Sequence, residues 1–468
     1  MHLADNDYDC DSYLRMITGA NEIGVCQQRL PSGKMYMDAR DGLAWDESEL
    51  DLTPVWTREP RLEAIENVCR NRLSLEDIET CDVTFYAQGC FNKLYLARTS
   101  NRQFLMRVSL PVHPQKKTLG EVTTLQFLRR STNIPVPEIF AYDESANDEI
   151  GYEWILMELM PGVPAYKKWR TLTTFQKAAL VQQIAGFQAQ MFQHTFFGIG
   201  TLTPGEEAAA QNEKPGEIVS IRFISGNRFN FDIARGPFRS THDWLTSYLD
   251  LVIKNHTLTK EEAEDEDDEE DAAFALSVTN RLVGLLPKIF PALQNPPERS
   301  VLWHQDLNLN NILVDEKGKV TAVVDWECVS AMPSWMATGM PEFLTGSTRE
   351  EEPKREKYAD ETPEEAQSVG PVLDADLDNE GKTDLYWVHL MEYETTQLRE
   401  VYTRWMCQLR PGWATEVKEN ILKEDFFKAV LRCDDGFALQ RILQWVDAVE
   451  NGEYPRLIDV LQAGFKVE

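Results

Sequence analysis

Short runs of apolar and aromatic residues alternate with turn residues early in the chain. The segments DVTFY (82–86), FNKLYLAR (91–98) and QFLMRVS (103–109) are rich in residues that favour strands. Turn residues separate them, with Gly89 in the first gap and the sequence TSN in the second. This pattern predicts three consecutive antiparallel strands.

The pattern then changes to a helix and one more strand. Residues 117–131 have helical spacing, and Thr118 followed by Glu121 three residues later fits an N-terminal capping box. Pro135 and the proline two residues after it disfavour a longer helix. Residues 151–162 (GYEWILMELMPG) predict one buried strand, closed by a Pro-Gly pair.

Helical spacing dominates the rest of the chain. Residues 173–194 place Leu180, Ile184, Phe187 and Met191 on one helical face. Similar patterns recur at residues 243–254, 272–285, 395–409, 414–431 and 437–449. We therefore expect an α+β protein with two lobes.

The predicted division has three parts. Residues 1–74 form an N-terminal extension that wraps or docks, residues 75–160 a small lobe with an antiparallel sheet, and residues 161–468 a large helical lobe. The two lobes join near residues 159–163, and clefts between lobes are common places for small ligands.

The net charge of the chain excludes some classes of binding partner. The chain of 468 residues has a formal net charge of −30, and residues 261–271 contain ten acidic residues and no basic one. So negative a surface repels nucleic acid and anionic membranes and weakly favours a cationic substrate. We interpret residues 261–271 and the charged segment 347–382 as insertions that form mobile loops.

Cysteine usage and the chain's start indicate a compartment. The eight cysteines form no CxxC pair and no zinc-like cluster with histidine, which indicates free, mostly buried thiols. The acidic N-terminus lacks an apolar signal core, and no segment approaches the ~20 apolar residues of a membrane span. We expect a soluble cytoplasmic protein.

The most informative stretch lies at residues 302–327 (LWHQDLNLNNILVDEKGKVTAVVDWE). Residues 311–315 and 320–327 predict a β-hairpin, which would bring Asp325 back beside the loop that holds Asp306 and Asn311. Each polar residue alone could simply cap a turn. Together they match phosphoryl transfer, with Asp306 as the base that accepts the proton of the attacking hydroxyl, and Asn311 and Asp325 as oxygen ligands of Mg²⁺.

This stretch resembles the catalytic loop and metal-binding segment of the aminoglycoside phosphotransferase family, which has a protein-kinase-like fold. The resemblance includes His304, Asp306, Asn311 and the triplet Asp325-Trp326-Glu327, and it extends to the segments FYAQGCFNKLYL, LMRVSLP, EVTTLQFL and IPVPEIFAYD. It covers roughly residues 80–345 and implies ATP and Mg²⁺ as cofactors and a hydroxyl of a small molecule as acceptor. It does not specify the acceptor.

The resemblance implies further residues at the nucleotide. Arg107 on the third strand would bind the phosphates and pair with Glu121, Gly89 would lie in the turn over the phosphates, and the backbone from Glu158 to Met160 would face adenine. The family usually has lysine where this chain has Arg107. The alternatives are a surface cation for Arg107, a capping residue for Glu121 and simple core packing for Met160.

Two other function classes remain open at this stage. One is a pseudokinase that binds nucleotide or a protein partner without catalysis, which the arginine at position 107 and the long insertions favour. The presence of Asp306, Asn311 and Asp325 together argues against a pseudokinase, because a scaffold needs no groups that bind metal and accept protons. The other is a protein kinase, which the Trp326-Glu327 pair disfavours because it replaces the Phe-Gly pair that allows the switch of protein kinases.

Overall fold

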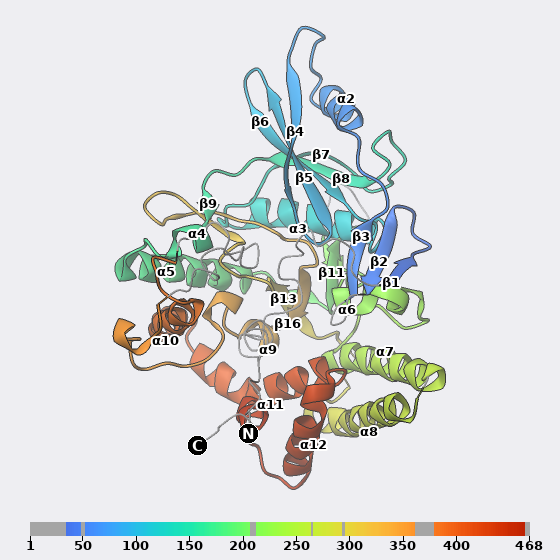
Figure 1. Ribbon diagram of the computed structural model, residues 1–468, viewed down its shortest axis with the longest axis vertical. Helices are drawn as coiled ribbons and strands as arrows, with labels where there is room; N and C mark the ends of the chain where they lie inside the picture. The colour runs from blue at the N-terminus through green and yellow to red at the C-terminus, as the bar shows by residue number, and fades with distance from the viewer. Residues whose placement is uncertain are drawn as a thin grey trace, which may run out of the picture.

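The fold is a sheet-rich small lobe on top of a larger helical lobe (Figure 1). The computed structural model of the chain describes residues 34–47, 52–205, 212–263, 265–292, 295–360 and 379–463. This arrangement confirms the predicted α+β architecture with two lobes.

The small lobe contains a five-stranded antiparallel sheet in the order β4-β5-β6-β8-β7. Its strands are β4 (Cys81–Gln88), β5 (Asn92–Thr99), β6 (Gln103–Ser109), β7 (Ile139–Asp143) and β8 (Glu153–Glu158). The three strands predicted before residue 110 and the buried strand β8 are confirmed. Strand β7 was not predicted, because we interpreted its start as the segment that ends the preceding helix.

The pairing register divides the side chains between the two faces of this sheet. Asn92 pairs with Ser109, and Arg107 pairs with Leu94 on one side and Ile155 on the other. Because directly opposed residues share a face, these side chains point the same way. Met106 and Val108 point to the opposite face, where both are fully buried.

The described part of the N-terminal extension covers that opposite face. It forms a three-stranded antiparallel sheet of β1 (Lys34–Met37), β2 (Leu43–Glu47) and β3 (Leu52–Trp56), followed by helix α2 (Leu62–Arg72). Leu43, Trp45 and Ile65 belong to the same hydrophobic core as Met106 and Val108. The described residues 34–47 and 52–74 of this extension thus pack on the small lobe, and residues 1–33 and 48–51 lie outside the described ones.

Helix α3 (Lys116–Ser131) packs against the Arg107 face of the sheet. The predicted capping box is wrong. The helix begins two residues before Thr118, and its N-cap is Gln115. Gln115 has a positive φ of 64°, and its side chain makes no capping hydrogen bond. Glu121 therefore lies in the second turn of the helix, free of any capping role and available to face the sheet.

The large lobe begins after β8 and consists mainly of helices around small sheets. Its longer helices are α5 (Thr174–Met191), α7 (Thr241–Glu262), α8 (Glu266–Ile289), α10 (Asp384–Leu409), α11 (Trp413–Leu431) and α12 (Gly436–Glu450). Its shorter ones are α4 (Ala165–Trp169), α6 (Ile221–Ile224), α9 (Ser334–Ala337), α13 (Leu457–Gln462) and the 3₁₀ turns Gly226–Asn230, Glu342–Leu344 and Arg355–Lys357. All the predicted helices are confirmed, most of them with longer bounds.

The strands of the large lobe are short. They are β9 (Val163–Pro164), β10 (Phe196–Phe197), β11 (Gly200–Thr203), β12 (Lys214–Pro215), β13 (Arg299–Trp303), β14 (Ile312–Val314), β15 (Val320–Val323) and β16 (Ser330–Pro333). Strands β14 and β15 form the predicted hairpin, and β9 extends their sheet. A second sheet has the order β10-β13-β16-β11-β12 and supports the segment before the hairpin.

The prediction that residues 261–271 form a loop is wrong. Helix α7 continues to Glu262, and α8 starts at Glu266 with Asp265 as its N-cap, whose side chain accepts a hydrogen bond from the Asp268 amide. Four acidic residues occupy the first turn of α8. Carboxylates are favourable at that end of a helix, so the acidic run forms the tip of a helical hairpin (Figure 1).

The second predicted insertion is only partly within the described residues, because 361–378 lie outside them. Its flanks are attached to helix α10. The Arg349 guanidinium donates to Glu392 at 2.9 Å, and the Arg349 amide donates to the Thr396 hydroxyl at 3.0 Å. Residues 347–360 are therefore held against the large lobe, contrary to a fully mobile loop.

Two general properties concern the described residues. Five of the described cysteines, Cys69, Cys81, Cys328, Cys407 and Cys433, are free thiols. No helix in the described ranges has the length and apolar character needed to cross a membrane.

Candidate active site

The hairpin of β14 and β15 brings the predicted catalytic loop and the Asp325 segment side by side. The Val324 amide donates to the Asn311 carbonyl at 2.9 Å. The buried ring of His304 contacts the Val324 carbonyl through Nε2 at 3.1 Å and packs edge-on against Trp326, with ring centroids 4.8 Å apart. His304 thus joins the start of the loop to the end of the hairpin.

Two amide side chains hold the Asp306 carboxylate. The Asn311 amide nitrogen donates to one carboxylate oxygen at 3.0 Å and to the Asp306 carbonyl at 2.8 Å. The Asn308 amide nitrogen donates to the other carboxylate oxygen at 2.8 Å. The half-buried carboxylate is therefore fixed from both sides, which suits a group that must meet its substrate in one orientation.

Asn308 was not predicted as a site residue. It lies on the same short loop, and the sequence NLNN (308–311) contains three asparagines of equal appearance. Its oxygen also accepts hydrogen bonds from the amides of Asn310 and Asn311, as an ordinary turn residue would. The sequence gives no signal that its nitrogen faces Asp306.

Asp325 lies at the end of the hairpin in a backbone conformation that is uncommon for residues other than glycine, with φ of 62°. Its side chain is 31% exposed, and Oδ1 accepts from Arg107 at 3.1 Å. Burial and the nearby Glu327 carboxylate raise the pKa of Asp325 to about 7, although Arg107 opposes this shift. Asp325 is therefore an open carboxylate in a negatively charged setting, as a cation ligand is.

Arg107 connects the two lobes. One guanidinium nitrogen lies 2.6 Å from Glu121 on α3, and the other lies 3.1 Å from Asp325 and 2.7 Å from a Glu327 oxygen. The pairing with Glu121 confirms the geometry that the resemblance implied. The alternative of a surface cation is wrong, because Arg107 is only 6% exposed.

Two further polar residues at this centre were not predicted. Lys117 and Asn92 both contact the Glu327 carboxylate, at 2.6 Å and 2.9 Å respectively. Lys117 lies at the start of a helix next to another lysine, a pattern that normally indicates a solvated cation. Only the tertiary packing of α3 against the sheet buries it.

The predicted phosphate turn lies at the β4–β5 connection. The Gly89 amide donates to the Asn92 carbonyl at 2.9 Å, which closes the turn. Gly89 is exposed, and a Cβ atom at this position would meet no atom within 4 Å. The structure therefore shows no local packing reason for glycine here, and the open surface of the turn remains accessible to a ligand.

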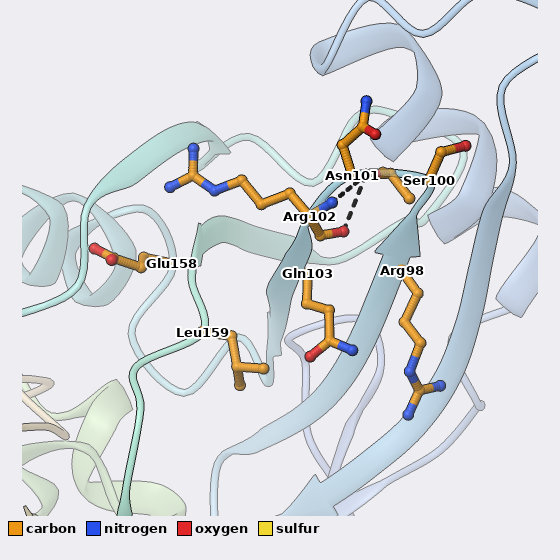
Figure 2. A pocket seen from close by; sticks show the side chains of 8 residues that line it. Arg98, Ser100, Asn101, Arg102, Gln103, Glu158 and Leu159 are labelled. Carbon is orange, nitrogen blue, oxygen red and sulfur yellow. Dashed lines mark hydrogen bonds between the residues drawn. The ribbon is translucent and has the colours of Figure 1, made fainter.

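The predicted hinge lies beside a hollow of about 530 Å³ at the outer ends of β5, β6 and β8. Figure 2 shows Glu158 and Leu159 on one side of it and the turn of Ser100, Asn101 and Arg102 on another. Arg98 pairs with Gln103, and this pair shares the sheet face of Arg107. These two lining residues therefore continue the Arg107 face towards the hinge.

Glu158 and Met160 mark the two ends of the predicted hinge. The Glu158 amide donates to the Glu138 carbonyl at 2.8 Å, and its carboxylate lies 3.5 Å from Arg129. The backbone amide and the carboxylate of Glu158 therefore both have protein partners. Met160 is half-buried in the connection to the large lobe.

The residues at this centre fit Mg²⁺ bound together with phosphate. Both hydrogen bonds of the Asn311 side chain use its nitrogen, so the amide oxygen is the atom that can ligate a cation. Across the described ranges, no group of three or more His, Cys, Asp or Glu side chains has the arrangement of a metal site. Mg²⁺ commonly uses one or two protein oxygens and completes its octahedron with phosphate and water, so Asn311 and Asp325 suffice.

Comparison with known proteins gives the family. Residues 82–336 match the Phosphotransferase enzyme family, abbreviated APH. The chain belongs to this family. The match includes the sheet of the small lobe, helix α3 and the β14–β15 hairpin. The site residues described above therefore lie within the part of the chain that matches the family.

Curated relatives of this phosphotransferase-family chain include proteins from fungi. A subtelomeric hrmA-associated cluster protein of Aspergillus fumigatus is 27% identical over 56% of this chain and 60% of its own length. A clavilactone A biosynthesis cluster protein of Ampulloclitocybe clavipes is 27% identical over 48% and 53%. Altered inheritance of mitochondria protein 9 of Saccharomyces cerevisiae is 21% identical over 63% and 55%. The chain thus spans about half to three fifths of the length of the relatives it matches.

Solved structures similar to this family member include two aminoglycoside phosphotransferases. The enzyme APH(4)-Ia is 14% identical, with a TM-score of 0.42 over 86% of this chain and 99% of its own. A gentamicin complex of APH(2″)-IIa is 12% identical, with a TM-score of 0.41 over 88% and 98%.

Proposed function

We propose that this protein is an ATP-dependent and Mg²⁺-dependent phosphotransferase that transfers the γ-phosphoryl group to a hydroxyl of a small molecule. Membership of a phosphotransferase family supports the reaction class. The observation that carries the proposal is the convergence of Asp306, Asn311 and Asp325 beside the Arg107–Glu121 ion pair.

Asp306 is the proposed base. Its carboxylate is fixed by Asn308 and Asn311, so it can accept a hydrogen bond from an acceptor hydroxyl in one direction and take its proton as the phosphoryl group is transferred. Fixing the base before the substrate arrives lowers the entropic cost of the reaction.

Arg107, Asn311 and Asp325 are the proposed nucleotide phosphate site. Arg107 would contact the phosphates, while the Asn311 amide oxygen and the Asp325 carboxylate would hold Mg²⁺. When bound, this ion neutralises the charge that develops on the phosphate oxygens. Arginine is always charged and presents several donors, so it can keep Glu121 and still meet an anion.

The nucleotide base would lie towards the hinge. Gln103, which lines the hollow beside Leu159, shares the sheet face of Arg107 and lies four residues from it along β6, or roughly 13 Å. That spacing supports placing adenine between them, with the hinge backbone after Glu158 as its polar partner. The net charge of −30 favours a cationic acceptor.

Calorimetry of nucleotide binding tests this proposal. ATP is titrated into the wild type and into Asp325→Ala, each with and without Mg²⁺. We expect Mg²⁺ to strengthen ATP binding in the wild type by at least about tenfold, or ~1.4 kcal/mol, and to have no such effect in the variant. Absence of ATP binding in the wild type would reject the proposal and favour a pseudokinase without nucleotide.

A screen of acceptors then tests the reaction. Small hydroxylated amines and a generic peptide mixture are each incubated with labelled ATP. We expect label in the small molecules. Label confined to peptides would overturn the assignment of a small-molecule acceptor.

A further inference from the structure

The third residue of the Asp325-Trp326-Glu327 triplet makes contacts quite different from those of the first. Asp325 is 31% exposed and contacts Arg107. The Glu327 side chain is only 8% exposed, and both of its oxygens accept hydrogen bonds from Asn92 at 2.9 Å. The oxygen Oε2 also lies 2.7 Å from Arg107 and 2.6 Å from Lys117.

The donors to Glu327 all come from the small lobe. Asn92 is the first residue of β5, Arg107 lies on β6, and Lys117 lies in the first turn of α3. Glu327 itself follows the hairpin of the large lobe, 235 residues from Asn92. Arg107 and Lys117 both lie within 2.7 Å of its Oε2, so two cations compensate this buried carboxylate.

Lys117 has no donor left for a ligand. Its ammonium group is 1% exposed and contacts Glu327, the Asn92 oxygen at 2.8 Å and the Ser109 hydroxyl at 3.3 Å. An ammonium group has three N–H donors, and these three acceptors use all of them. Lys117 therefore holds protein groups in place and cannot serve as a phosphate ligand as it stands.

Asn92 extends this arrangement to the phosphate turn. Its side-chain oxygen accepts from Lys117 and from the Ser109 hydroxyl, and its nitrogen donates to Glu327. Its carbonyl accepts from the Gly89 amide. One set of contacts thus connects the turn at Gly89 with the segment that carries Asp325.

We propose that Lys117, Asn92 and Glu327 form an interlobe clamp, in which Glu327 positions the Asp325 segment against the small lobe and does not itself ligate Mg²⁺. This inference rests on the proposed nucleotide site and deepens it. The clamp assigns separate tasks to the two carboxylates of the triplet. Asp325 faces the cation, and Glu327 fixes where Asp325 stands relative to Arg107 and the phosphate turn.

Three variants test the clamp with a matched control. Lys117→Met and Glu327→Gln each remove one charge. Asn92→Ala removes the hydrogen bonds of an uncharged side chain to Glu327, Lys117 and Ser109 and leaves no unpaired charge. Lys116→Met makes the first substitution at the exposed neighbouring lysine of the same helix turn. Each protein is titrated with ATP, with and without Mg²⁺, and the factor by which Mg²⁺ strengthens binding is compared.

We expect all three clamp variants to lose the same large part of this factor, about tenfold, while Lys116→Met keeps it. Combining Lys117→Met with Glu327→Gln should lose no more than either alone, because both act through one contact. If Glu327→Gln loses the factor while Lys117→Met and Asn92→Ala keep it, Glu327 is a metal ligand and the clamp is rejected. If all three keep the wild-type factor, the contacts do not position Asp325, and the inference is equally rejected.

Melting temperatures of the nucleotide-free proteins in EDTA give a readout independent of the proposed function. Breaking a buried ion pair from one side should lower the melting temperature by on the order of 5 °C or more in Lys117→Met and in Glu327→Gln. The double variant should melt no lower than Lys117→Met alone. If the wild type fails to bind ATP while this pattern holds, the nucleotide proposal fails and the clamp stands as an interlobe contact; losses that add up fully in the double variant overturn it.

Discussion

Two regions of this molecule are rich in acidic side chains, and they use them in opposite ways. At the catalytic hairpin, Glu327 and Asp325 meet cations from the other lobe at distances of 2.6 to 3.1 Å. At the tip of α7 and α8, residues 261–271 contain ten acidic residues, and the nine of them that the structure describes are exposed. Carboxylates are held by cations of the protein in the first region and solvated by water in the second.

The difference follows from the cost of removing charge from water. A buried carboxylate must be matched by donors, so its neighbours are determined in number and position. An exposed carboxylate is stabilised by water and screened by salt, so its neighbours are nearly free to change. Effects of substitution should therefore be large at the hairpin and small at the tip.

The largest effect is expected at Asp306. Asp306→Asn keeps the shape of the side chain but removes the proposed base, so turnover should fall by roughly 10²–10⁴-fold while ATP affinity changes by less than about threefold. Steady-state rates and calorimetry measure the two quantities. Glu316→Gln, at an 85% exposed carboxylate of the same hairpin, is the matched control and should keep full turnover. Full turnover in Asp306→Asn would show that this residue is not the base.

The next effect concerns stability and nucleotide affinity together. Arg107→Met leaves Glu121 and Glu327 with fewer donors in a buried place, and breaking such a centre from one side costs about 3–5 kcal/mol in the free energy of unfolding. ATP binding should weaken by at least about tenfold. Urea unfolding and calorimetry give both values, with Arg281→Met, at a 34% exposed guanidinium paired with Asp447, as the control. If both variants lose the same stability and the same ATP affinity, a buried charge centre is no more sensitive to substitution than a partly exposed one.

A moderate effect is expected from Asn308. Removing its nitrogen in Asn308→Ala takes away one of the two amides that hold Asp306. We expect a loss of roughly tenfold in turnover with ATP affinity retained. The cost in stability should be about 1 kcal/mol for each of the hydrogen bonds lost, because the side-chain oxygen also accepts from the amides of Asn310 and Asn311. A variant with unchanged turnover would show that Asn311 alone is enough to orient the base.

The smallest effect is expected at the acidic tip. Replacing the four acidic residues of the first α8 turn by their amides relieves mutual repulsion but removes favourable charges at the helix start, so the two changes oppose each other. The melting temperature should move by less than about 2 °C, and ATP affinity should stay unchanged. Asp265→Ala should cost more, about 1 kcal/mol, because it removes the N-cap. A loss of ATP affinity in the fourfold variant would show that the tip takes part in the site.

The same contrast explains how much the sequence could predict. Strands β4, β5 and β6 and the catalytic hairpin follow from local patterns of apolar and turn residues, and so does the meeting of Asp306 with Asn311. The resemblance added the pair of Arg107 with Glu121. These features depend on residues that are near each other in sequence, or on the spacing of His304, Asp306, Asn311 and Asp325 that the family resemblance rests on.

The missed features depend on tertiary contacts. Lys117 was overlooked because a lysine near a helix start is ordinarily exposed, and only the packing of α3 buries it. Dense charge at residues 261–271 suggested a loop, whereas Asp265 as a capping residue followed by acidic residues was an available signal for a helix start. The expected cap at Thr118 was wrong because Gln115 ends the preceding turn with a positive φ, which the sequence did not indicate.

The fixed ring of Trp326 has a consequence for inhibitor design. Its side chain is 2% exposed, its indole N–H donates to the Val323 carbonyl at 2.9 Å, and its ring packs on His304. Compounds that select a protein kinase by occupying the space left when its metal-binding segment turns outward need such a turn. In this protein that movement requires withdrawing a buried indole and breaking the Glu327 contacts at once, so competitive inhibitors should be designed against the inward arrangement and its Arg107 face.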